Sequence, residues 1–223
     1  MAIVGSSEIP KIHSIVHVGA HYGQEIEDYQ ALNPDLIVWI EADPNTFLRL
    51  TEFTDKNSKD GIRHMCINAL VSDKDDEVRD FFITSNDRES SSIFRTTELH
   101  AKFGAAMTGE TLKLRTARLD SILRSAGVAP DSLDILILDV QGAEMLCLTG
   151  VGDYLKYIKL LKLEVTKETA FYEGGAVFSD LDAWLRDRDF VRISELPDGP
   201  WHGDCIYQNQ AVGQERFPQK YIF

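Results

Sequence analysis

Cysteine is scarce in this chain of 223 residues. The three cysteines, Cys66, Cys147 and Cys205, lie far apart and form no Cys-x-x-Cys or mixed Cys/His pattern. Such patterns mark structural zinc sites and the disulfide frameworks of small secreted domains. Neither kind of framework is therefore expected, and no metal site is assigned to the chain.

The sequence also lacks a cationic leader and a long apolar segment. Its first residues, MAIVGSSEIPKIHS, do not have the charged start and apolar region of a signal peptide. No apolar run reaches the length that spans a bilayer. We therefore expect a cytoplasmic protein with no membrane partner.

Basic residues are in short supply, with 23 Lys and Arg against 36 Asp and Glu and a net charge of -13. Binding to a phosphate backbone needs basic surfaces, so the charge speaks against nucleic acid as a partner, although it leaves room for a local basic patch. A hydrophobic content of 43% is ordinary for a soluble globular protein. At this length we expect residues 1–223 to form a single domain.

The clearest pattern that is present lies in residues 14–50, which are typical of a βαβ unit. Two apolar runs flank a helix-length polar segment, and parallel strands need such a crossover. Gly19 and Gly23 allow a sharp turn and a close approach to a ligand at the start of the helix. Glu41 closes the second run, where folds of this kind hydrogen-bond a ribose. This pattern predicts an adenosine-type cofactor.

The glycine pattern lacks the third glycine of Gly-x-Gly-x-x-Gly, the fingerprint that cradles a pyrophosphate. A cofactor with a ribose but no pyrophosphate needs fewer glycines, and S-adenosylmethionine is such a cofactor. A nicotinamide cofactor is the alternative among enzymes. The other interpretation is structural, with the glycines serving a tight turn and Glu41 a solvated strand end.

Apolar runs and helix-length segments alternate along the rest of the chain, which predicts an α/β fold. The run 133–140 (LDILILDV) is the most apolar, as for a central parallel strand that is covered on both faces. The expected strands are 14–19, 36–41, 63–71 (including the turn that follows the strand), 77–84, 111–117, 133–140, 158–165, 190–193 and 204–207. The expected helices are 23–32, 44–54, 119–126, 143–148 and 179–188.

Acidic residues stand at or near the ends of three apolar runs, namely Glu41, Asp139 and Glu164. In open α/β sheets, ligands bind at the carboxyl ends of the strands. A carboxylate is costly to bury without a partner, so its repeated appearance there predicts a solvated cleft that binds something. The alternative is that each carboxylate only caps the helix that follows.

Six short motifs occur in order along residues 14–168. They are VGAHYGQE (18–25), WIEADPNTF (39–47), INALVSDKDDEV (67–78), SSSIF (90–94), TARLDSIL (116–123) and ILDVQGAEMLCLTG (137–150). This series resembles the FkbM-type methyltransferases. The resemblance implies a Rossmann-like class I methyltransferase sheet of seven strands, the last antiparallel, with helices on both faces. Residues 169–223 would complete the sheet and supply loops for the acceptor.

The resemblance also implies S-adenosylmethionine as the cofactor and assigns contacts with it. The assigned residues are Gly19, Ala20, His21, Gly23, Glu41, Ala42, Asn68, Ala69, Asp139 and Val140. The first four would line the methionine part, Glu41 and Ala42 the ribose and adenosine, and the next two the adenine. Asp139 would lie beside the methyl donor and either bind its amino group or face the acceptor.

The chain departs from the family's motifs at several positions. His21 stands where Asn is common, Leu138 where Lys is common, and Gln141 where Glu is common. A catalytic or metal role is therefore not carried over to position 141. Leu138 and Gln141 favour the alternative function, a non-catalytic cofactor-binding or scaffold protein on a methyltransferase fold.

The resemblance implies methyl transfer, typically to a hydroxyl oxygen, which depends on orientation and on a base for the acceptor. The candidate catalytic residues are Asp139, Glu164 and His202, the last of them in a predicted loop. The candidate acceptor contacts are Ser90, Ser91, Ser92, Tyr172 and Trp201. The expected function is O-methylation of a small molecule or carbohydrate, with no nucleic-acid partner.

Overall fold

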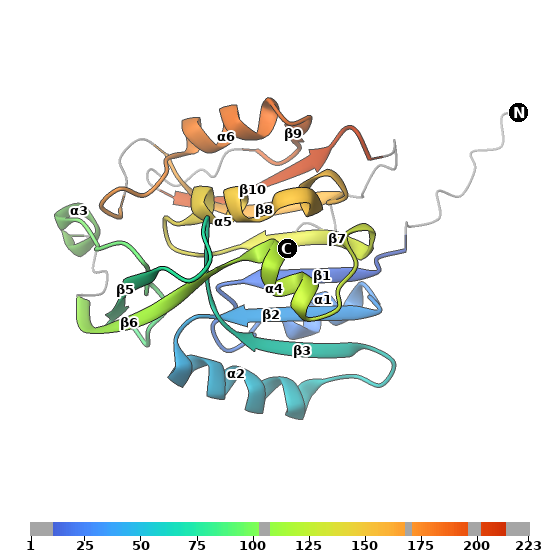
Figure 1. Ribbon diagram of the computed structural model, residues 1–223, viewed down its shortest axis with the longest axis horizontal. Helices are drawn as coiled ribbons and strands as arrows, with labels where there is room; N and C mark the ends of the chain where they lie inside the picture. Colours follow the sequence, from blue (N-terminus) through green and yellow to red (C-terminus); the bar gives the residue numbers. More distant parts are fainter. Residues whose placement is uncertain (1–10, 103–107, 168–170, 196–201, 213–223) are drawn as a thin grey trace, which may run out of the picture.

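The computed structural model describes residues 11–102, 108–167, 171–195 and 202–212 (Figure 1). The larger sheet consists of β1 (Ser14–Val18), β2 (Leu36–Glu41), β3 (Arg63–Asn68), β7 (Leu133–Leu138), β8 (Leu160–Thr166), β9 (Phe190–Arg192) and β10 (His202–Asn209). Its strand order is β3-β2-β1-β7-β8-β10-β9. The order reverses between β1 and β7, and ligands bind at such a point in open α/β sheets.

The pairing directions confirm the expected fold class. Strand β1 is parallel to β2 and β7, β2 is parallel to β3, and β7 is parallel to β8. Strand β10 is antiparallel to both of its neighbours, β8 and β9. The chain therefore has the seven-stranded Rossmann-like sheet with its last strand antiparallel.

A second sheet of three strands was not expected. It contains β4 (Leu70–Ser72), β5 (Val78–Thr84) and β6 (Thr108–Arg118), in the order β4-β6-β5. Strand β3 agrees with the strand expected from residue 63, but the turn expected after it leads into β4, which belongs to the other sheet. The chain leaves the larger sheet at Ala69, whose N–H donates to Glu41 O over 3.1 Å. The sequence predicts the turn at this point but not the strand of a second sheet that follows it.

The helices follow the expected pattern with shifted ends. They are α1 (Ile26–Ala31), α2 (Pro44–Asn57), α3 (Glu98–Lys102), α4 (Leu119–Ser125), α5 (Glu144–Gly150) and α6 (Phe178–Arg186), with 3-10 turns η1 (Pro130–Ser132) and η2 (Gly152–Lys156). The helix expected from residue 23 starts later because Gly23 has a φ of 82°. In the described part of the chain, no helix has the length and apolar character needed to cross a membrane.

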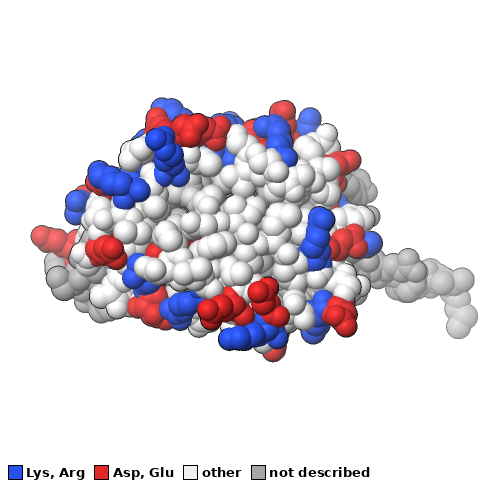
Figure 2. All heavy atoms as spheres, turned by 60° about the horizontal axis from the view of Figure 1, so that its bottom comes forward, with Lys and Arg blue, Asp and Glu red and all other residues white. Residues whose placement is uncertain are grey.

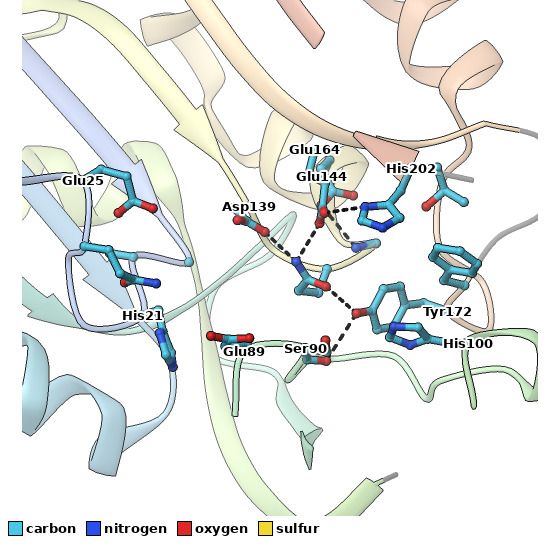
Figure 3. A pocket seen from close by; sticks show the side chains of 17 residues that line it. His21, Glu25, Glu89, Ser90, His100, Asp139, Glu144, Glu164, Tyr172 and His202 are labelled. Carbon is cyan, nitrogen blue, oxygen red and sulfur yellow. Dashed lines mark hydrogen bonds and ion pairs between the residues drawn. The ribbon is translucent and has the colours of Figure 1, made fainter. Parts of the chain in front are cut away.

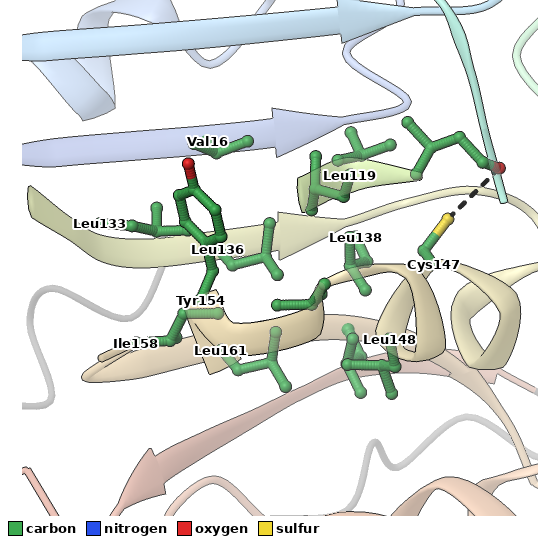
Figure 4. Packing of buried hydrophobic residues seen from close by; sticks show 14 of the residues in the cluster. Val16, Leu119, Leu133, Leu136, Leu138, Cys147, Leu148, Tyr154, Ile158 and Leu161 are labelled. Carbon is green, nitrogen blue, oxygen red and sulfur yellow. Dashed lines mark hydrogen bonds between the residues drawn. The ribbon is translucent and has the colours of Figure 1, made fainter. Parts of the chain in front are cut away.

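The core lies on both faces of the larger sheet because the side chains of each strand alternate between them. Leu136 and Leu138 of β7 pack against α4, α5 and α6, whereas Ile135 and Ile137 face the side of α1 and α2. Figure 4 shows the first of these clusters, where Cys147 lies beside the β7 leucines. Each such buried aliphatic side chain stabilises the fold by about 1.5–3 kcal/mol. The core thus holds β1, β2, β7 and β8 in place with their carboxyl ends at one edge.

Candidate functional site

Two adjoining pockets lie at the carboxyl ends of the parallel strands. The larger has a volume of about 340 Å³ and the smaller about 50 Å³. Residues common to both are Gly19, His21, Glu89, Asp139 and Gln141. Because these come from the ends of β1 and β7 and from the segment after β5, the site is assembled from distant parts of the chain.

The turn after β1 depends on Gly19. Its φ is 81°, a conformation that side chains other than glycine rarely adopt. A Cβ at this position would lie 1.7 Å from Asp139 O. The N–H groups of Gly19 and Ala20 both donate to Ile40 O, at 2.9 and 3.1 Å. The glycine therefore lets the β1 turn lie directly against the ends of β2 and β7.

Glu41 is fixed at the end of β2 and is only 8% exposed. Its Oε2 accepts the N–H of His21 at 2.9 Å, and its Oε1 accepts the N–H of Asp43 at 2.8 Å. Burial raises the pKa of Glu41 to about 7, against the pull of these hydrogen bonds. The side chain lines the smaller pocket with Ala42, Ala69 and Val140.

A hydrogen-bonded network crosses the larger pocket (Figure 3). The Gln141 Nε2 donates to Asp139 Oδ1 and to Glu164 Oε2, both at 2.6 Å. Tyr172 donates its hydroxyl hydrogen to Gln141 Oε1. The other carboxylate oxygen of Glu164, Oε1, lies 3.1 Å from His202 Nδ1. One amide thus links the end of β7 to the ion pair formed by β8 and β10.

The larger pocket is strongly acidic. Carboxylates that line it are Glu25, Glu89, Asp139, Glu144 and Glu164, and no lysine or arginine among the described residues does so. Asp139 is accessible from the pocket, but the surrounding protein removes most of its water, and this raises its pKa together with the charge of Glu164. Burial also raises the pKa of Glu144 to about 8. Such a pocket favours a positively charged ligand.

Most of the residues expected at the site lie there, but several do not. Gly19, Ala20, His21, Asp139, Glu164, His202, Ser90 and Tyr172 line the larger pocket, and Ser91 lines the smaller. Gly23 instead faces Leu50 of α2. Asn68 donates to Glu41 O at 2.8 Å, and the buried Ser92 hydroxyl donates to Gln141 O at 2.8 Å. Trp201 lies outside the described residues.

The expected placement of His202 in a loop is wrong. His202 begins β10 and pairs with Thr166 across the antiparallel ladder. The ladder brings it next to Glu164 because side chains two residues apart share a face of a strand. The strand expected over 204–207 therefore starts two residues earlier, at His202.

Several lining residues were not predicted, among them Glu25, Glu89 and His100. Glu25 is the last residue of the first motif, and Glu89 stands directly before the serine run. His100 lies in α3, within a segment of weak pattern, so the sequence offers no signal for it. Among the described residues, no group of three or more His, Cys, Asp or Glu has the arrangement of a metal site.

The sequence profile of the "Methyltransferase FkbM domain" matches residues 17–192, which is more than half of the chain. The chain belongs to the FkbM methyltransferase family. The resemblance drawn from the six motifs is thereby confirmed. No match to a curated protein is found by sequence.

Several solved structures share the fold of this FkbM-family chain. M. capricolum TrmK with S-adenosyl-homocysteine is 8% identical, with 96% of this chain and 70% of that chain covered and a TM-score of 0.45. A putative tRNA methyltransferase of Streptococcus pneumoniae with S-adenosyl-L-methionine is 12% identical, with 98% of this chain and 74% of that chain covered and a TM-score of 0.45. The magnesium protoporphyrin IX methyltransferase of Synechocystis with bound SAM is 9% identical, with 90% of this chain and 71% of that chain covered and a TM-score of 0.47.

These structures correct the expected partners. The sequence predicted a small-molecule or carbohydrate partner and excluded nucleic acid because of the net charge. tRNA methyltransferases are among the structures of similar fold, so the exclusion of nucleic acid is withdrawn. The physical reason is that net charge sums over the surface and does not describe each part of it. Figure 2 shows basic and acidic side chains side by side around one face of this FkbM-family chain.

The cofactor of this FkbM methyltransferase is S-adenosylmethionine, as expected. The residues present fit it. Its net positive charge suits a pocket lined by carboxylates, and the Glu25 Oε2 is buried without a hydrogen-bond partner among the described residues. Glu41 and Ala69 line the smaller pocket next to it, in the places expected for ribose and adenine contacts.

Proposed function

We propose that the protein methylates a hydroxyl oxygen, on a small molecule or on a sugar unit that can itself belong to a larger chain. The observation that carries this proposal is the 3.1 Å pair between His202 Nδ1 and Glu164 Oε1 at the wall of the larger pocket. We further propose that residues 1–223 form one methyltransferase domain and that the protein is cytoplasmic.

His202 would act as the base. Bound S-adenosylmethionine supplies a methyl group on a positively charged sulfur, and its transfer to a hydroxyl oxygen releases a proton and leaves a neutral thioether. Glu164 accepts a hydrogen bond from His202 Nδ1, which leaves Nε2 free to take that proton. The bond to Glu164 also raises the pKa of His202, so it stabilises the imidazolium that forms.

The remaining site residues would bind and orient. Asp139 would hold the amino group of the cofactor, and Glu41 would accept hydrogen bonds from its ribose. Ser90 and Tyr172 would contact the acceptor, because both line the larger pocket on the side of His202 (Figure 3). Holding the two reactants in line supplies most of the acceleration in such a transfer.

Calorimetric titration with S-adenosylhomocysteine tests the cofactor part of the proposal. We expect micromolar binding that Glu41→Ala weakens by about 100-fold, because the ribose loses its charged hydrogen-bond acceptor. Glu52→Ala, on the exposed side of α2, serves as the control and should bind normally. Absence of binding to the unaltered protein would reject the proposal.

Transfer of a labelled methyl group to a panel of hydroxyl compounds, sugars and tRNA tests the catalytic part. With an accepted compound, His202→Gln should lower kcat by about 100-fold or more while S-adenosylhomocysteine binding is kept. The rate should rise with pH through the raised pKa of His202. Cofactor binding without transfer to any compound would favour the non-catalytic alternative.

A further inference from the structure

The wall of the larger pocket around His202 is aromatic. The rings of His100 and Phe171 are stacked with centroids 5.1 Å apart, and Tyr172 lies edge-on to His100 at 5.1 Å. Phe171 also contacts His202, with centroids 5.6 Å apart. Phe171 and Tyr172 are 6% and 3% exposed. These rings form a rigid surface that excludes water from one side of the acceptor region.

The charges beside this aromatic wall are negative. Glu164 supports the wall from β8, and Glu89 enters the same pocket from the segment after β5 (Figure 3). The nearest arginine of that segment, Arg88, turns away and pairs with Asp43 and Glu110. Carboxylates next to aromatic faces attract cations, through charge and through the ring quadrupole.

His100 supplies an independent sign that a ligand belongs here. The residue is 8% exposed and lines the pocket. Its Nδ1 is buried and has no hydrogen-bond partner among the described residues. A buried polar atom is costly when it stays unpaired, so this nitrogen is available to a donor or acceptor group of a ligand in the pocket.

We propose that the methyl acceptor is a hydroxyl compound that carries a positively charged amine, such as an amino sugar, with the amine held by Glu164 and Glu89 against the aromatic wall. A phosphate or carboxylate in its place would face these carboxylates with no cation from the pocket lining to balance them. This inference rests on the proposed function.

The test uses the full chain saturated with S-adenosylhomocysteine and three pyranoses that differ mainly in charge: glucosamine, glucose and glucuronate. Dissociation constants are measured by NMR titration. We expect glucosamine to bind about ten-fold more tightly than glucose, and glucuronate to bind more weakly still. Glu89→Gln should remove most of the advantage of glucosamine over glucose. Asp60→Asn, in the loop before β3 at the opposite edge of the sheet, is the matched control and should leave the order unchanged.

The outcomes separate this inference from the proposed function. Failure of S-adenosylhomocysteine to bind rejects the proposed function before any sugar is added. With the cofactor product bound, equal affinity for the three sugars, tighter binding of glucuronate or no binding of glucosamine would overturn the cationic acceptor. Methylation of tRNA in the transfer assay would overturn it as well.

Discussion

At the scale of single residues, the site depends on a few positions with closely defined contacts. Gly19 is the strictest of them, since its missing side chain lets the β1 turn touch the backbone of Asp139. Gln141 is another, because a single amide donates to Asp139 and Glu164 while its oxygen accepts from Tyr172. A glutamate there would place a further negative charge between two carboxylates.

Gly19→Ala should abolish S-adenosylhomocysteine binding and lower the melting temperature. Its Cβ would lie 1.7 Å from Asp139 O, so the turn must move away from β7. Gly127→Ala is the matched control, since Gly127 also has a positive φ, of 73°, but its Cβ would meet nothing within 4 Å. The control should lose about 1 kcal/mol through backbone strain and keep binding. Equal effects of the two variants in calorimetry and thermal unfolding would contradict the close-contact argument.

At the scale of elements, the segment 85–92 closes over the smaller pocket. Arg88, Glu89 and Ser91 line that pocket. Three contacts hold the segment in place. Arg88 pairs with the buried Asp43, and Arg49 binds Asp87 through two hydrogen bonds of 2.9 and 3.0 Å. In the third contact, His21 Nε2 lies 2.9 Å from Asp87 O. These contacts hold the segment against the smaller pocket.

Loosening these contacts should speed the exchange of the cofactor product. We expect Arg49→Ala to raise the dissociation rate of S-adenosylhomocysteine several-fold in stopped-flow measurements, because an exposed ion pair is worth up to about 1 kcal/mol. Arg88→Ala should have a larger effect and also destabilise the protein, since it leaves Asp43 buried without its cation. Arg79→Ala, whose partner Glu77 lies away from the pockets, is the control. Unchanged rates in Arg49→Ala and Arg88→Ala would show that the segment does not limit exchange.

At the scale of the whole molecule, ionisable groups fall into two sets. Ion pairs with arginine or lysine lower the pKa of surface carboxyls such as Asp35 and Asp87. At the strand ends burial raises the pKa of Glu41 to about 7 and of Glu144 to about 8. The fold thus buries these two carboxyl groups although burial disfavours their charged form.

The ligand-free protein should lose stability as the pH rises. The folded state holds the proton of Glu144 up to about pH 8, whereas the unfolded chain releases it near 4.5. The protonated group therefore stabilises the fold fully below pH 4.5, and this stabilisation falls as the pH rises and is lost above about pH 8. In Glu144→Gln, which keeps an oxygen to accept the N–H groups of Val140 and Gly142, the loss of unfolding free energy between pH 5 and pH 9 should be smaller by roughly 3 kcal/mol. Urea unfolding across this range provides the measurement, with Glu27→Gln on α1 as control. An identical pH dependence in the two variants would refute the role of Glu144.

The sequence by itself determined the fold class and the cofactor end of the site. Apolar runs of strand length mark β1, β2 and β7, and glycines or acidic residues at their ends mark where a ligand lies. These signals are local, because strand burial, turn geometry and strand-end position each depend on a few neighbouring residues. The placement of Gly19, Glu41 and Asp139 at the two pockets could therefore be predicted.

Only the tertiary structure decided the acceptor side. The pairing of β10 with β8 brings His202 to Glu164, 38 residues away, and α3 brings His100 to the same wall. The tertiary structure also places β4 in a different sheet from β3 and leaves Asn68 outside the two pockets. Long-range strand pairing is chosen by packing of the whole sheet, which no short pattern encodes. The chemistry of the acceptor pocket therefore arises from contacts between segments that the sequence leaves unconnected.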